Sequence, residues 1–528
     1  MRTWNVVVLL LVAAFVAAPA VQAQSDDDLR KEVNQLKADL QKVISNNAAI
    51  ADENARLRTK VDSIDTEGND LESRINALSE SLSYAPSTTV NSVANPITFT
   101  GQFRSRGGWT FDRDFGADTG GSAGDSDDDG SFVDARFLVG INYELDRNVV
   151  AHFSMQSTGL YDNGSTTAPG NGLGEVDLYE GWVHVNNLFG RKEFSVRTGR
   201  QEVVLGNEFQ FGNNDFFAGQ TFDGTNWMWQ SENFNLNFLW MKLQNDTNNF
   251  SAINHPYASG GDGYDDDELY SLYLTIKSLK DMEIDLYWIY LNGNDDGGGS
   301  TGTLGNGLSG GGTGAFFHTI GARIGGTFAV ASGLDYNLEF AYQFGDLEGA
   351  GAGGSDLDVE NFAVEAEIGI TFNANNNFRV FVRFLFAEGG DNDESGYIPL
   401  FTERHANAGT GGTQNYRARY GLMDIVPMTN VMTLQGGLHF DPRADWTVGA
   451  TFIWAQADED VATANGMKDD IGFEIDLFAD YRYSDQTTFG FGLGLFFADD
   501  ATPLAAGGTA GSNDDLAVLI YTQVLVVF

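Results

Sequence analysis

Apolar and polar residues alternate along most of the sequence from residue 97 to residue 528. Successive side chains of a β-strand point to opposite faces, so this alternation predicts strands with one apolar and one polar face. The apolar face is rich in aromatic residues and the other face in charged ones, which is typical of a strand between lipid and a wet interior. A soluble sandwich also alternates, so the pattern alone leaves both architectures open. The clearest stretches are residues 334–344, 359–372 and 471–483.

The lengths of the connections separate these two architectures. Short turns alternate along the chain with long acidic or glycine-rich loops. Membrane barrels place short turns at one rim and long loops at the other, whereas a sandwich has no reason to sort its connections in this way. The short turns fall at residues 146–148, 279–282, 331–333, 373–377, 441–445 and 484–486, and the long loops at residues 112–131, 161–175, 244–268, 292–315, 345–358, 388–429, 457–470 and 499–514.

These observations predict an all-β transmembrane barrel of about 18 antiparallel strands over residues 97–528. An even number of strands puts both ends of the barrel at the rim with short turns, which is the periplasmic rim of bacterial barrels. The last stretch ends on Phe528, which resembles the aromatic signal read by the outer-membrane insertion machinery. The predicted strands start at Ile97, Phe132, Val149, Val176, Glu193, Phe222, Phe234, Leu269, Glu283, Phe317, Leu334, Val359, Phe378, Val431, Trp446, Ile471, Thr487 and Leu516.

The first residues follow a different pattern. Residues 1–23 combine Arg2, an apolar run over 6–18 and the small-x-small sequence Val21-Gln22-Ala23, which predicts a secretory signal peptide. A membrane anchor helix would need about 20 apolar residues, and this run is shorter and is followed by Pro19. The mature chain is therefore expected to leave the cytoplasm, and the barrel prediction places it in the cell outer membrane.

Residues 24–84 carry a heptad repeat, which predicts a periplasmic α-helical coiled coil that joins copies of the chain into a homo-oligomer. Asn47 and Asn54 stand at a positions, where asparagine fixes the register or the number of strands. An amphipathic helix packed on the rest of the chain is the alternative, but such helices rarely run so far. Residues 85–96 predict a linker. The aliphatic d positions are Leu29, Leu36, Val43, Ile50, Leu57, Ile64, Leu71 and Leu78.

Composition excludes several kinds of chemistry. The chain has no Cys, which excludes disulfides, thiolate metal sites and a cysteine nucleophile. The net charge of -44 argues against nucleic-acid binding. No set of nucleophile, base and acid stands out, and the six His residues show no metal-ligand spacing, so we expect neither an enzyme nor a cofactor. The mean hydropathy of -0.22 excludes a bundle of membrane helices.

Two acidic loops leave a weaker alternative open. Residues 125–130 match the start of an EF-hand loop, but its twelfth position is Arg136 in place of the bidentate Glu. Loose Ca²⁺ binding by this loop and by residues 265–268 is one interpretation, and a solvated acidic loop is the other.

Charged residues of both signs are expected to point into the barrel. Facing charges across a pore select solutes by charge and size. The same charges would equally well form a lattice of salt bridges that stiffens the wall, so both interpretations stay open. The candidate pore-lining residues are Arg104, Arg106, Arg136, Glu180, Arg197, Arg200, Asp223, Arg323, Glu339, Glu365, Arg379, Arg383 and Arg482.

Two stretches of sequence carry a resemblance beyond a generic barrel. The first contains Thr198-Gly199-Arg200-Gln201, then Leu205-Gly206-Asn207-Glu208 and Thr221-Phe222-Asp223-Gly224. It resembles the alginate export family of outer-membrane porins. Arg200 has two interpretations here: it lines a constriction, or it pairs with Asp223 or Asp215 and pins the loop of residues 206–220 inside the barrel.

The second stretch runs from Ile398 to His405 and continues with Tyr420-Gly421-Leu422-Met423-Asp424. It is similar to a loop of the same family that has the pattern Leu-Phe/Tyr-Pro-Thr-x-His followed by Gly-x-x-Asp. Glu403 and Arg404 depart from this pattern, and residues 406–419 look like an insertion. Arg404, His405 and Asp424 are therefore candidate gate residues, or residues that order this loop by hydrogen bonds.

The resemblance implies an 18-stranded barrel and a transport role. We expect an outer-membrane porin for passive diffusion or export of polar or charged solutes, among them an acidic polysaccharide, with membrane lipid and the solute as partners. The alternative is a structural anchor whose coiled coil oligomerises or tethers the outer membrane to the cell wall. Alginate is a polyanion, and the acidic loops would repel it only within about 10 Å at ordinary salt.

Overall fold

The computed structural model describes residues 35, 37, 97–111, 130–160, 176–213, 216, 219–244, 267–293, 314–328, 333–350, 354–372, 376–391, 393–405, 418–463, 466–502 and 516–528. Two compact units divide the chain, Met1–Ala94 and Asn95–Phe528. The predicted signal peptide, coiled coil and linker lie outside the described residues, apart from Gln35 and Lys37, which are helical. None of the described helical segments is long and apolar enough to cross a membrane.

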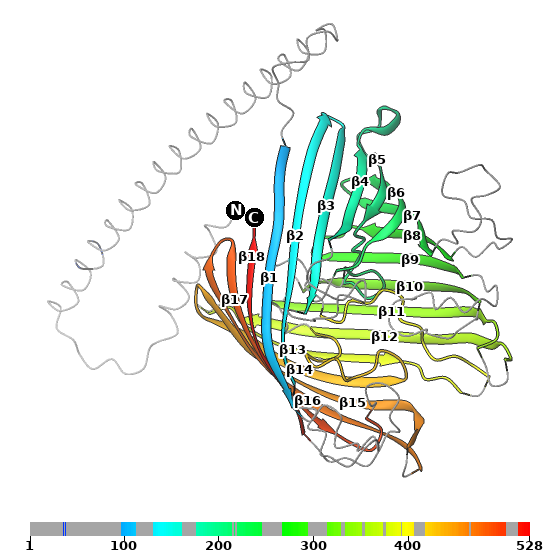
Figure 1. Ribbon diagram of the computed structural model, residues 1–528, viewed down its shortest axis with the longest axis vertical. Coiled ribbons are helices and arrows are strands. Elements are labelled where there is room, and N and C mark those ends of the chain that lie inside the picture. Colours follow the sequence, from blue (N-terminus) through cyan, green and yellow to red (C-terminus); the bar gives the residue numbers. More distant parts are fainter. Residues whose placement is uncertain are drawn as a thin grey trace, which may run out of the picture. The chain divides into compact units, whose positions relative to one another are not determined.

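The second unit is a barrel of 18 strands, as the sequence predicted (Figure 1). Its one short 3-10 helix among the described residues, η1 (Leu188–Gly190), lies in the turn between β4 and β5. The strands are β1 (Ile97–Phe111), β2 (Gly130–Asp146), β3 (Val149–Leu160), β4 (Asp177–Val185), β5 (Phe194–Gln201), β6 (Phe222–Gln230), β7 (Phe234–Gln244), β8 (Asp267–Ile276), β9 (Met282–Gly293), β10 (Ala315–Thr327), β11 (Leu334–Leu347), β12 (Leu357–Phe372), β13 (Phe378–Ala387), β14 (Val431–Arg443), β15 (Trp446–Thr463), β16 (Gly466–Ser484), β17 (Thr487–Ala498) and β18 (Leu516–Val527).

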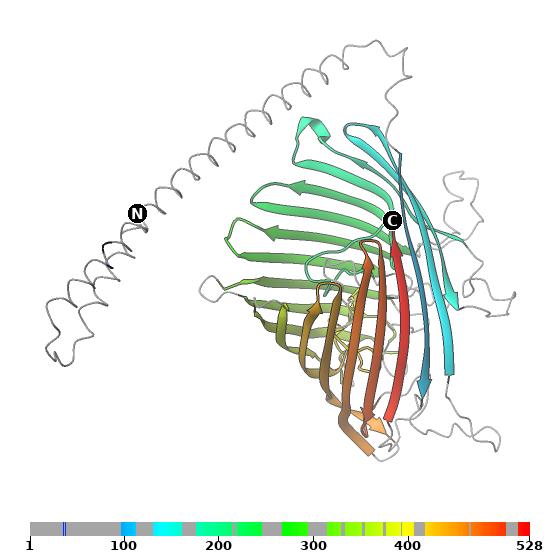
Figure 2. The ribbon, with the colours of Figure 1, turned by 90° about the vertical axis from the view of Figure 1, so that its left-hand side faces the viewer.

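Every strand pairs antiparallel with its neighbours in the chain, and β1 pairs with β18 to close the ring. Figure 2 shows these two strands side by side. The N–H of Gly101 donates to the carbonyl of Phe528 at 2.8 Å, and the N–H of Phe528 donates back at 3.0 Å. Closure leaves no strand edge unpaired, which is the condition for a sheet to stand in hydrocarbon.

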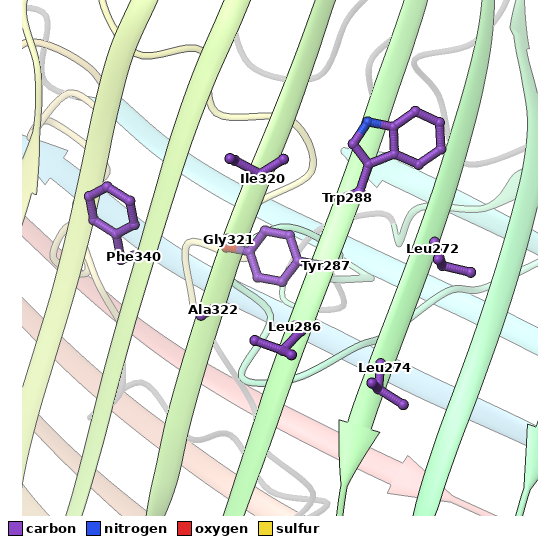
Figure 3. Close-up of a pocket in the computed structure, with 9 residues that line it drawn as sticks. All are labelled: Leu272, Leu274, Leu286, Tyr287, Trp288, Ile320, Gly321, Ala322 and Phe340. Atoms are coloured by element: carbon purple, nitrogen blue, oxygen red, sulfur yellow. The ribbon is translucent and has the colours of Figure 1, made fainter.

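The outer face of the barrel is apolar. On β11 and β12, Leu338, Phe340 and Ile368 are 48%, 44% and 49% exposed, so the predicted apolar faces point outward. Figure 3 shows a shallow groove in this face, where Ala322 lies between Leu286 and Phe340 in the register of β9, β10 and β11. Exposed aliphatic and aromatic side chains in such numbers fit contact with lipid hydrocarbon.

Aromatic rings mark both edges of this apolar band. Near the short turns, Trp446 stacks on Tyr481 with ring centroids 5.1 Å apart, and Phe372 stacks on Phe378 at 5.7 Å. Near the long loops, Tyr290 stacks on His318 at 4.5 Å. Rows of aromatic side chains at both interfaces are a feature of transmembrane barrels.

Two details differ from the sequence prediction. Most of the loop predicted over residues 457–470 is strand, because the β15–β16 pairing continues to Thr463 opposite Gly466. Ile471, predicted to face outward with Phe473, is only 1% exposed. The register of β16 shifts at Gly472, whose φ of +128° suits glycine, so the alternation changes face there.

Candidate channel interior

The described parts of two connecting segments lie inside the ring of strands. They are residues 202–213, 216 and 219–221 between β5 and β6, and residues 388–391, 393–405 and 418–430 between β13 and β14. They meet as a short parallel ribbon: the Gly212 N–H donates to the Phe401 carbonyl at 2.8 Å, and the Phe401 N–H donates to the Gln210 carbonyl at 3.2 Å. We call them the first and second inner segments. Loops that bond to each other inside a barrel narrow its interior.

An apolar cluster fixes this ribbon to the wall. The ring of Phe401 lies 6.0 Å from that of Phe211 and 4.7 Å from that of Phe222, the first residue of β6. Phe209 stacks on Tyr397 at 6.3 Å. These side chains are at most 4% exposed. Burial of several aromatic side chains makes the inner segments part of the packed structure.

Arg419 joins both inner segments to β12. Its guanidinium donates to the Glu365 carboxylate at 2.6 Å and to the Glu403 carbonyl at 2.8 Å, and it also donates to the carbonyl of Asn207. Burial alone lowers the pKa of Arg419, but the Glu365 carboxylate outweighs burial and leaves that pKa raised. The arginine therefore stays charged where it is buried.

The predicted gate residues form one cluster. The Arg404 guanidinium and the His405 imidazole both reach the Asp424 carboxylate, each at 2.9 Å. Burial raises the pKa of Asp424, but His405 and Arg404 outweigh it, so the pKa lies below its ordinary value of 3.8. These residues were expected either to gate the channel or to order the loop by hydrogen bonds, and the contacts seen here are hydrogen bonds of the second kind.

Phe216 connects this cluster to the β1 wall. Its ring stacks on His405 with centroids 3.9 Å apart, and the Arg106 guanidinium lies 4.2 Å from the centroid of the same ring. Arg106 also donates to the Phe216 carbonyl at 3.1 Å and pairs with Asp134 at 3.0 Å. The first inner segment thus spans the interior from the β12 side to β1.

Several of the candidate pore-lining arginines, among them Arg106, lie in ion pairs on the inner wall. Arg379 pairs with Asp335 at 2.6 Å and with Glu367 at 2.8 Å. Arg383 shares Glu367 at 2.6 Å. Such pairs are what the salt-bridge interpretation predicts. Arg323 likewise pairs with Glu283 at 3.0 Å and with Asp285.

Three further candidates have other partners, and a fourth is buried on β1. Arg136 donates to Gln156 and Gln102 at 3.1 and 3.2 Å. Glu339 accepts from the Tyr287 hydroxyl at 3.0 Å. Arg482 lies exposed near the short turns and donates to the Ala444 carbonyl at 3.0 Å, and Arg104 is 5% exposed on β1.

The inner face of β3–β5 carries an aromatic and charged patch. The Arg197 guanidinium lies 4.3 Å from the centroid of the Trp182 ring, which also stacks on His152 at 5.0 Å. The Trp182 indole donates to Glu180 at 3.0 Å. All four side chains remain partly exposed. This patch contains the predicted residues Glu180 and Arg197.

Arg200 and Asp223 are paired as predicted, at 2.6 Å, but the predicted position in the pore is wrong. Their neighbours Gln201 and Phe222 point inward and are 0% and 4% exposed. Arg200 and Asp223 therefore point outward, with side chains 40% and 52% exposed. The physical reason is the period of two, which puts Arg197 and Arg200 on opposite faces of β5.

Sequence reasoning missed the residues that hold the inner segments. Arg419 was assigned to an insertion, although it directly precedes the motif that starts at Tyr420. The alternation over residues 471–483 puts Glu474 and Asp476 on the polar face, but it gives no link to that motif. No short-range signal connects them, because Arg419 and Glu365 are 54 residues apart in the chain.

Comparisons with known proteins agree with this architecture. The alginate export family profile matches residues 95–513. The barrel is similar to OccK8 (OprE) of Pseudomonas aeruginosa, with TM-score 0.50, 12% identity and coverage of 82% of this chain and 98% of that chain. OccK11 (OpdR) of the same organism and OccAB4 of Acinetobacter baumannii give TM-score 0.49 at 10% and 11% identity, covering 82% of this chain and 96% and 100% of theirs. No curated protein matches the chain.

The profile covers most of the sequence and nearly all of the barrel, including both motifs that carried the resemblance. A closed barrel with an apolar outer band and a polar interior fits that family. The chain therefore belongs to the alginate export family, and it is an outer-membrane porin through which solutes diffuse or are exported.

Proposed function

We propose that this porin is a passive channel, not an enzyme, and that solutes pass the inner segments along the inner face of β3–β5. The observation that carries this proposal is an asymmetry in exposure. Glu365 and Glu474 on the opposite wall are 2% and 0% exposed, because the inner segments cover them. Arg197 and Trp182 on β5 and β4 stay partly exposed. A solute that enters the interior meets the exposed side chains first.

Arg197 gives this path its charge. Among the described residues, Arg197 forms no direct ion pair with Asp or Glu; its guanidinium lies on the face of Trp182, and the Glu180 and Glu202 carboxylates act on its charge from farther away. A guanidinium that contacts no carboxylate directly keeps N–H donors for a carboxylate or phosphate of a solute. Glu180 lies beside it and adds the opposite charge. We therefore propose polar or charged solutes with a modest preference for anions, an acidic polysaccharide among the candidates.

Reversal potentials across a salt gradient in planar bilayers test this proposal. Arg197→Met should shift the selectivity of the channel towards cations, since it removes a positive charge from the path. Arg200→Met is the matched control, because Arg200 lies on the same strand and faces outward. Equal shifts in both variants would remove Arg197 from the path, and absence of conductance in the intact protein would exclude the channel itself.

We also propose that residues 24–84 join copies of the chain and reach the cell wall. The heptad register, with its aliphatic d positions, supports this proposal. As a second candidate function, the barrel would then serve as an anchor for a periplasmic stalk as well as a channel.

A further inference from the structure

Two acidic side chains on β16 hold the second inner segment against the wall. Glu474 and Asp476 share the inner face of the strand and are 0% and 2% exposed. The Met423 N–H donates to Glu474 at 2.9 Å, and the Leu422 N–H donates to Asp476 at 3.3 Å. The contact is therefore between the backbone of the segment and two buried carboxyl groups.

Glycines shape the notch in which this contact forms. Gly421 has a φ of +85°, and a Cβ there would lie 2.3 Å from a carboxylate oxygen of Glu474. Gly494 is the β17 partner of Asp476, and a Cβ there would lie 2.6 Å from Cγ of Met423. Side chains at these positions would push the segment off the wall, so the fit depends on their absence.

Among the described residues, no direct ion pair offsets the charge of Glu474 and Asp476, and the basic group that acts on Asp476 is His405. Within the part of the chain that the structure describes, no Lys or Arg forms an ion pair with Glu474 or Asp476. Oε2 of Glu474 and Oδ1 of Asp476 are buried without a hydrogen-bond partner. An ionised carboxylate is costly to bury, and two neighbouring carboxylates avoid the cost by sharing a proton.

The groups around Glu474 and Asp476 determine how this pair responds to a change in pH. Thr451 on β15 donates to Asp476 at 3.1 Å, and β17 contributes Gly494 and Phe496, neither of which titrates. The second inner segment adds Asp424, whose charge is already engaged by Arg404 and His405. Tyr521 of β18 also lies near Asp476, and His405 acts on the charge of Asp476 as well.

We propose that Glu474 and Asp476 form a proton-controlled latch for residues 418–430. With one shared proton, the pair carries a single negative charge, which the N–H groups of Leu422 and Met423 offset. Loss of that proton places two charges in the notch beside Asp424. The segment then leaves the wall, because water solvates both carboxylates once the notch opens. Alkaline pH should therefore widen the channel.

The latch can be tested by measuring the conductance of the full-length protein in planar bilayers between about pH 5 and about pH 9. The two carboxyl groups titrate as one unit, so the measurement reports on the pair. The conductance of the native chain should rise at the alkaline end, and Glu474→Gln should lose that rise because it cannot ionise. Asp480→Asn is the control, since Asp480 is a buried inward carboxyl on the same strand, 6% exposed, without a recorded contact to the segment. A flat native profile, or the same loss in Asp480→Asn, would overturn the latch.

This first readout rests on the proposed channel function, so a second one is independent of conduction. The chain has no Cys, so Met423→Cys introduces a single thiol, at a position that is 3% exposed. At alkaline pH a maleimide should label this thiol faster in the parent barrel than in a Glu474→Gln background at the same pH. Equal labelling rates in two folded barrels would overturn the latch even if the channel conducts. Heat-modifiable gel mobility verifies that both barrels are folded.

Discussion

The guanidinium of Arg419 lies 2.6 Å from the carboxylate of Glu365, and both side chains are 2% exposed. Arg419 belongs to the second inner segment and Glu365 to β12. The same guanidinium reaches carbonyls of the first inner segment, including that of Glu208 at 3.3 Å. One side chain thus joins two loops to the barrel wall.

Replacement of this arginine should release both loops. Arg419→Met leaves the Glu365 carboxylate buried without its partner, which should cost about 3–5 kcal/mol of stability. We expect a lower thermal unfolding temperature and larger, noisier single-channel conductance. Arg443→Met is the control, because the Arg443–Asp445 pair lies in an exposed turn and should be worth about 0–1 kcal/mol. Equal effects of the two substitutions would refute the role given to Arg419.

Gly199 should tolerate no side chain. Its φ is +118°, and a Cβ would lie 2.2 Å from the Gly181 carbonyl oxygen on β4. Gly199→Ala should therefore destabilise the barrel by about 1–3 kcal/mol, seen as a lower temperature of the heat-modifiable mobility shift. Gly436→Ala provides the comparison, because a Cβ there would meet nothing within 4 Å. If Gly199→Ala is as stable as Gly436→Ala, β4 and β5 do not approach each other closely enough at Gly199 to exclude a side chain.

Acid should weaken the cluster around Asp424. A carboxyl group whose pKa is lowered in the folded protein stabilises the fold above its ordinary value of 3.8, and this contribution is lost as the pH falls through the lowered pKa. Asp424→Asn should therefore be less stable than the native chain at neutral pH, by about 1.5–3 kcal/mol for lost charged hydrogen bonds. The difference should shrink below about pH 4. Thermal unfolding of both proteins across this range would show it, and a gap independent of pH would contradict it.

Deletion of residues 26–82 should separate the two proposed functions. If the heptad segment joins copies of the chain, its loss should convert an oligomer into monomers in detergent, measured by light scattering. Conductance in planar bilayers should persist, because the described barrel closes on itself without that segment. Detachment of the envelope in cells that carry the deletion would support the tether. An unchanged oligomeric state would contradict self-association through the heptads.

The strands could be predicted from the sequence because the surroundings of each strand determine the residue types along it. Lipid on one side and polar groups on the other impose a period of two that is visible within a dozen residues, as in β12 from Leu357 to Phe372. The same local rule also failed where the backbone broke it. At Gly472 the register shifts, and Ile471 turns from the predicted outer face to the interior.

The inner segments could be anticipated only in part. Their motifs pointed to Arg404, His405 and Asp424, which do lie together. Their attachment to the wall depends on contacts between distant parts of the chain, such as Phe216 with Arg106 and Met423 with Glu474. Such contacts follow from closure of the ring, which brings strands together in space whatever their separation in sequence, and no local pattern records them.

The pairing of β1 with β18 also sets an order of events. The β18 partners of residues 102–111 lie more than three-quarters of the chain away, so one edge of β1 has no partner until the last strand is in place. An open edge invites pairing with the wrong strand or with another copy. That edge therefore needs protection until β18 arrives, and a chain that stops before β18 cannot seal its wall.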